Sequence, residues 1–151
     1  MKKSLLLILI TCISAFFFNI NAQTQPENAS FEDWEDVGLP DEEPVDWSSI
    51  KTSDNSTTNP LAPVVWDQST DAHTGSFSLK LFNVETIGGI IASGTVTNGR
   101  VHAEFDPSAS FVFTDVNDPR WNTPCTDRPD SIVAWVKYYP EQGDVGKIKA
   151  L

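Results

Sequence analysis

Two large aromatic side chains near the end of the chain have the spacing of a sugar-binding platform. Residues 131–139 alternate as a β-strand does, which places Trp135, Lys137 and Tyr139 on one side. Flat aromatic faces stack on the axial C–H groups of a sugar, and a few fixed polar groups hold its hydroxyls. These three residues are therefore candidate ligand-binding residues. The alternative is that Trp135 packs beneath a loop, since large aromatics are mostly core residues.

A second candidate lies in the loop of residues 115–129, which is rich in turn formers. Trp121 stands in the middle of this loop beside Arg120. Binding residues are concentrated on loops that a rigid scaffold holds, so we expect Arg120 and Trp121 to be exposed and to contact a ligand. A tryptophan that anchors the loop to the core is the alternative.

The segment of residues 27–46 is strongly acidic. It contains nine acidic side chains and no basic one, with Phe31 and Trp34 as apolar anchors. Calcium prefers about six to eight oxygen ligands, so carboxylates beside backbone carbonyls suit a cation site. A solvated acidic loop is the alternative, and the spacing is not that of an EF-hand.

Carboxylates also offer a route to catalysis. Glu104 and His102 share the polar side of a predicted strand, while Asp115, Asp118 and Asp127 lie in one loop. Such groups could form an acid/base pair across a cleft. In a chain with 21 acidic residues, however, such pairs arise by chance. No Gly-x-Ser-x-Gly elbow is present, and the two histidines lack the spacing of a helical zinc pair.

The N-terminus has the layout of a signal peptide. A basic start, an apolar run and a small residue at position 22 predict cleavage after residues 1–22, with residues 23–27 as a short linker. The apolar run is too short for a transmembrane anchor. The net charge of −11 repels phosphate backbones, which argues against nucleic acid as a partner. After cleavage only Cys125 is left, so no disulfide can form within these residues.

Short alternating runs separated by turn signals predict an all-β fold, an antiparallel β-sandwich or jelly roll. We expect strands at residues 63–67, 77–81, 111–113 and 131–139, and a hairpin at Asn98-Gly99 that pairs residues 95–97 with 100–105. Phe77, Leu79 and Leu81 should face the core. A new alternating run begins at residue 146 and stops at 151, so we expect a sandwich truncated at the C-terminus.

Several motifs together resemble a known family. The elements Asn28-x-x-Phe31-Glu32, Pro44-x-x-Trp47 and Asp71-Ala72-His73-x-Gly75-Ser76-Phe77 are similar to the opening of galactose-binding-like jelly rolls among carbohydrate-binding modules. Thr126-Asp127-Arg128-Pro129-Asp130-Ser131, followed by residues 135–138, resembles a carbohydrate-metabolism domain of secreted Bacteroidota proteins. The resemblance covers residues 28–139.

The resemblance implies a non-catalytic jelly roll over residues 28–151 of a multidomain protein, secreted by a Gram-negative bacterium through type IX secretion. In related modules a structural calcium is held by positions that correspond here to Glu32 and the 71–76 turn, with Asp71 and Ser76 as ligands. The sequence thus predicts a module that binds a polysaccharide or other glycan and is joined to downstream domains. The alternatives are a structural or adhesive surface domain that packs against its neighbours and, less favoured, a glycoside-active enzyme.

Overall fold

The computed structural model describes residues 25–86, 88–126, 128–141 and 143–149. The predicted signal peptide and the first two linker residues lie outside this part. Within the described residues, no helix has the length and apolar character needed to cross a membrane.

The described chain is built from short strands and single-turn 3-10 helices, in agreement with the predicted all-β class. The strands are β1 (Trp34–Glu35), β2 (Glu43–Pro44), β3 (Trp66–Ser69), β4 (Ser78–Leu81), β5 (Val84–Glu85), β6 (Ile91–Ala92), β7 (Arg100–His102) and β8 (Phe111–Phe113). The 3-10 helices are η1 (Asn59–Leu61), η2 (Pro107–Ala109) and η3 (Pro119–Trp121).

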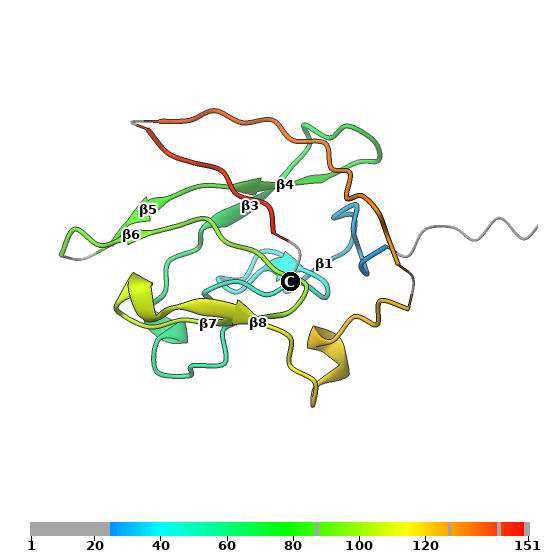
Figure 1. The fold of residues 1–151 in the computed structure, drawn as a ribbon. Helices are drawn as coiled ribbons and strands as arrows, with labels where there is room; N and C mark the ends of the chain where they lie inside the picture. Colours follow the sequence, from blue (N-terminus) through cyan, green and yellow to red (C-terminus); the bar gives the residue numbers. More distant parts are fainter. Residues whose placement is uncertain (1–24, 87, 127, 142, 150–151) are drawn as a thin grey trace, which may run out of the picture.

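The strands form antiparallel two-stranded ribbons. β1 pairs with β2, β3 with β4, β5 with β6, and β7 with β8. In the longest ribbon, Trp66 lies opposite Leu81 and Gln68 lies opposite Leu79. Figure 1 shows β3–β4 and β5–β6 along the upper side of the view, with β7–β8 along the lower side. In the part of the chain that is described, the named strands form no sheet larger than a pair.

The buried apolar core is small and includes residues in or beside β3 and β7. Val65 is fully buried, and Trp66 and Val101 are almost fully buried. The indole N–H of Trp66 donates to the carbonyl of Glu42 at 2.6 Å, which satisfies its polar atom. The loop after β2 closes this core, because the hydroxyl of Ser48 accepts a hydrogen bond from the amide of Val101 at 3.2 Å.

Several predicted strands are present, but one pairing is wrong. Strands β4 and β8 match the predicted runs, and β3 begins a few residues later than expected. The hairpin at Asn98-Gly99 does not form: β7 pairs with β8, while Thr97 forms an isolated bridge with Ser48. Gly99 lies against the backbone of Phe113, so the absent side chain lets β8 approach instead of marking a tight turn.

The apolar row of β4 is only partly covered, contrary to expectation. Phe77 and Leu79 are half-buried, whereas Leu81 is 42% exposed. A two-stranded ribbon buries an apolar face only where another element lies over it, and the end of β4 is not so covered.

The predicted strand at residues 131–139 is also absent. Every residue of this segment is exposed, and its backbone forms no ladder within the described chain. Alternation predicts which side chains share a face once a strand is paired, but it does not supply the neighbouring strand. Figure 1 shows the segment, in orange, passing over the ribbon of β3 and β4.

Candidate functional site

The rings of His73 and Trp135 are stacked. Their centroids are 4.0 Å apart and their planes differ by 8°. Trp135 is nevertheless 75% exposed, so the imidazole covers one face of the indole and leaves the other open to solvent. This arrangement fixes the plane of an aromatic surface without burying it.

An ion pair lies next to this stack. The ammonium of Lys137 donates to a carboxylate oxygen of Asp71, and both side chains are more than half exposed. The hydrogen bond to Asp71 raises the pKa of Lys137. Tyr139, the third predicted ligand residue of this segment, is 82% exposed. We call His73, Trp135, Lys137 and Tyr139 the platform.

Glu32 holds the turn of residues 71–77, which supplies His73 to the ring stack and Asp71 to the ion pair. The amide of Ser76 donates to both carboxylate oxygens of Glu32 at 3.0 Å, and the amide of Phe77 donates to one of them at 3.1 Å. Gly75 has φ +77°, a left-handed conformation that glycine adopts without steric cost. A carboxylate that accepts backbone N–H bonds is a strong anchor. Glu32 therefore fixes the turn on which His73 and Asp71 sit.

Protein donors occupy the carboxylates of two predicted calcium ligands, Glu32 and Asp71. Glu32 accepts from amides, Asp71 is paired with Lys137, and Ser76 contributes its N–H to Glu32. N–H donors and an ammonium repel a cation, which needs oxygen ligands. No cluster of three or more His, Cys, Asp or Glu side chains able to hold a metal occurs in the described residues. In this arrangement protein donors occupy the carboxylates of Glu32 and Asp71, and calcium binding stays a prediction.

An open hollow adjoins the turn. It has a volume of about 660 Å³ and is lined by Glu32, Trp34, Gln68 and Phe77, among others. Its lining combines apolar surface with polar side chains, a mixture that suits an amphipathic ligand such as a sugar. Because Glu32 and Phe77 belong to both features, the hollow and the turn are neighbours.

Arg120 and Trp121 occupy a different place, and the expected exposure of Trp121 is wrong. Trp121 is only 5% exposed and closes η3, whose first turn is capped by Asp118 accepting from the amide of Arg120 at 3.0 Å. The guanidinium of Arg120 lies 4.5 Å from the indole centroid. Turn-forming residues predict an exposed loop, but here the loop folds its tryptophan inward. Trp121 thus anchors the loop, which was the alternative prediction, and a ligand contact of Arg120 or Trp121 stays a prediction.

Arg120 also links two acidic strands. It forms an ion pair with Glu35 of β1 and lies 3.6 Å from the carboxylate of Glu43 on the adjacent β2. Glu43 is 4% exposed, and one of its oxygens has no hydrogen-bond partner among the described residues. Burial raises the pKa of Glu43 to about 8, with the nearby carboxylates of Asp36 and Asp41 adding to the shift. Sequence analysis missed this residue, because no pattern distinguishes it from its acidic neighbours.

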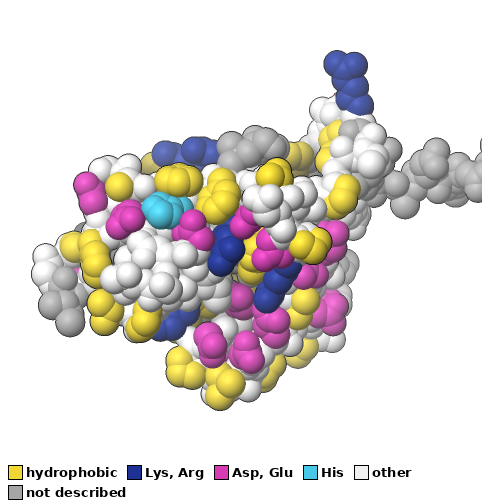
Figure 2. Space-filling view, turned by 90° about the horizontal axis from the view of Figure 1, so that it is seen from below, with side chains coloured by type: hydrophobic (Ala, Val, Ile, Leu, Met, Phe, Trp, Pro, Cys, Tyr) yellow, Lys and Arg dark blue, Asp and Glu magenta, His cyan; other side chains and the backbone are white. Residues whose placement is uncertain are grey.

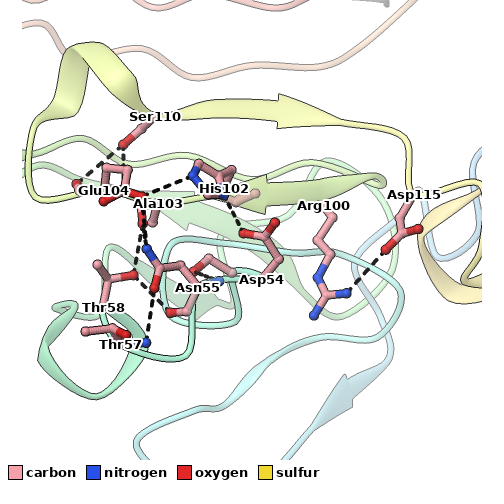
Figure 3. A network of polar contacts seen from close by, with 12 residues as sticks. Asp54, Asn55, Thr57, Thr58, Arg100, His102, Ala103, Glu104, Ser110 and Asp115 are labelled. Carbon is pink, nitrogen blue, oxygen red and sulfur yellow. Dashed lines mark hydrogen bonds and ion pairs between the residues drawn. The ribbon is translucent and has the colours of Figure 1, made fainter.

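Three of the acid/base candidates, His102, Glu104 and Asp115, make polar contacts at β7. His102 lies between two carboxylates, with Nδ1 2.8 Å from Asp54 and Nε2 3.2 Å from Glu104, as Figure 3 shows. Arg100 pairs with Asp115 at 3.3 Å in the same view. Each of these groups is engaged with a protein partner that ties a loop to β7. Of the other two candidates, Asp118 caps η3 and Asp127 lies outside the described residues.

Comparison with family models, with curated proteins and with solved structures returned no match. The geometry of the platform and its turn is therefore the basis for a functional proposal.

Proposed function

We propose that this chain is a secreted, non-catalytic module that binds a polysaccharide or other glycan at the platform. The observation that carries the proposal is the Trp135 indole, held flat by His73 with one face open. An aromatic surface whose orientation is fixed in advance loses little conformational freedom when a ligand binds. Lys137 and Asp71 beside it offer a donor and an acceptor for sugar hydroxyls.

The remaining parts of the proposal come from sequence patterns and the resemblance. They are cleavage of residues 1–22, export by type IX secretion to the exterior or surface of a Gram-negative bacterium, and a β-sandwich or jelly-roll architecture. A structural calcium near Glu32 belongs to the same group.

Retardation in native gels that contain a polysaccharide tests the binding function. We expect the full-length protein to migrate more slowly in some glycan, and the Trp135→Ala and Tyr139→Ala variants to lose this retardation. Val133→Ala is a matched control, because Val133 is an equally exposed apolar residue of the same segment, at 82%. If the full-length protein binds no glycan of a broad array, the proposal is wrong.

A structural or adhesive role is the second candidate, and one observation favours it. Residues 132–148 expose several apolar side chains besides the aromatics, among them Ile132, Val136, Val145 and Ile148. Such a surface suits packing against a neighbouring domain. In that case Trp135→Ala would lower the melting temperature of the full-length protein, and no glycan would bind.

A further inference from the structure

We infer that the platform selects uncharged polysaccharides and discriminates against uronate-containing and sulfated ones. This inference rests on the proposed glycan-binding function and names the chemical class of its ligand. The observation behind it is that the charged side chains near Trp135 are paired with other groups of the protein.

The charged groups at the platform are committed to protein partners. Lys137, the cation beside Trp135, is bound to Asp71, and the carboxylate of Glu32 accepts backbone amides. Recognition of a carboxylate or sulfate needs a cation with free donors, most effectively the fork of an arginine. A polyanion here would meet the carboxylate of Asp71 beside the ammonium of Lys137, so the pair offers it no net positive charge.

Three other cations of the described chain also have protein acceptors. Arg100 pairs with Asp115, Arg120 with Glu35, and the ammonium of Lys51 donates to the carbonyl of Ala62 at 3.0 Å. Figure 2 shows acidic side chains spread over the face in view, with basic side chains lying next to some of them. With a net charge of −11, the field of the chain repels a polyanion as it approaches.

An ion pair and an aromatic face together suit a neutral sugar. A hydroxyl both donates and accepts, so adjacent hydroxyls can bond to Asp71 and Lys137 without separating them. The open face of Trp135 can stack on the ring of the same sugar. Neither contact requires a charge on the ligand, so affinity should depend only weakly on salt.

Competing polymers test the inference on the full chain. The probes are a neutral β-glucan and a neutral galactomannan, against polygalacturonate and a sulfated galactan, in titrations at low and high NaCl. We expect the protein to bind a neutral polymer at least about tenfold more tightly than either polyanion, a difference of about 1.4 kcal/mol. That affinity should stay within about twofold between the two salt concentrations.

A charge variant makes the test sharper. Asp71→Asn removes the partner of Lys137 and should increase affinity for polygalacturonate by about threefold or more, mostly at low salt. Asp67→Asn is the control, because it changes the net charge equally at an exposed position of β3. A preference of the unaltered protein for a polyanion, or no difference between the two variants, overturns this inference alone. If the protein binds none of the four polymers and no glycan of the broad array, the proposed glycan-binding function is wrong as well.

Discussion

Glu32 fills the space into which a side chain at Gly75 would project. Its carboxylate lies closer to the position of that missing Cβ than any ordinary van der Waals contact allows. The same carboxylate accepts the amides of Ser76 and Phe77. Gly75 is therefore required both by its left-handed backbone and by the anchor that holds the turn, and His73 depends on this turn for its position under Trp135.

Replacing Gly75 by alanine should destabilise the protein more than the same change at another left-handed glycine. Gly75→Ala strains the backbone and displaces Glu32, so we expect a loss of about 2 to 4 kcal/mol in the free energy of unfolding. Gly38 has φ +83° with open space around it, so Gly38→Ala should cost only about 1 kcal/mol. Urea denaturation of both variants measures the difference. Equal losses would mean that Glu32 does not constrain the turn.

The role of Glu32 can be separated from calcium binding. Glu32→Gln replaces a charged acceptor by a neutral amide, and we expect a loss of about 1 to 3 kcal/mol because charge-assisted hydrogen bonds are weakened. If hydrogen bonds alone hold the turn, the loss is the same in calcium and in chelator. A bound ion instead stabilises the folded state by mass action. Chelator would then lower the melting temperature of the unaltered protein but not that of Glu32→Gln.

Glu43 should make stability depend on pH. Burial raises its pKa in the folded state to about 8 from an ordinary 4.5, so the folded chain keeps a proton that the unfolded chain releases. The stability from this proton is complete below pH 4.5 and is lost as the pH rises through about 8. Glu43→Gln stays neutral at every pH. At alkaline pH we therefore expect its unfolding free energy to exceed that of the unaltered protein by a few kcal/mol, the order of magnitude that corresponds to the pKa shift of Glu43.

Unfolding curves at pH values from mildly acidic to mildly alkaline measure this difference. Glu85→Gln is the control, because Glu85 is exposed on β5 and should show no comparable gain. Parallel pH profiles for Glu43→Gln and the unaltered protein would show that Glu43 is ionised in the folded state, with Arg120 as its counter-ion.

Truncation to alanine should lower the stability of the protein much more at one tryptophan than at another. Trp121→Ala removes a buried ring and should cost about 3 to 5 kcal/mol. Trp135→Ala removes a ring that is 75% exposed and should change stability by less than about 1 kcal/mol. Calorimetric melting of the isolated chain distinguishes them. A large loss for Trp135→Ala would mean that its contact with His73 supports the fold, which would favour the structural role.

Local patterns predicted local features well and distant contacts poorly. Strand β4 follows from alternation, and β8 from a short apolar run after a turn, both of which a few residues define. β7 pairs with β8 and not with residues 95–97, and Thr97 instead bridges to Ser48. Ser48 is distant in the chain, so the local turn signal at Asn98-Gly99 could not indicate this contact. Trp121 is buried in a loop whose Arg120 pairs with Glu35 of β1, a distant contact that turn formers do not indicate.

The candidate site was predicted in pieces. The resemblance selected Glu32 and the 71–76 turn, which do meet, although through amides and a carboxylate. Alternation selected Trp135 and Lys137 on a strand that is absent. Lys137 and Asp71 are 66 residues apart in the chain, and no periodicity relates them. Their meeting makes one site from two separate sets of predicted residues.

The segment of residues 128–140 is attached to the rest of the molecule by side chains, since its backbone forms no hydrogen bond with described backbone groups. Its amide protons should therefore exchange with deuterium almost as fast as those of a free peptide, whereas the amides paired between β3 and β4 are protected. A glycan that stacks on Trp135 would slow exchange locally, and deuterium uptake at this one stretch would then locate the docking position directly from mass spectra.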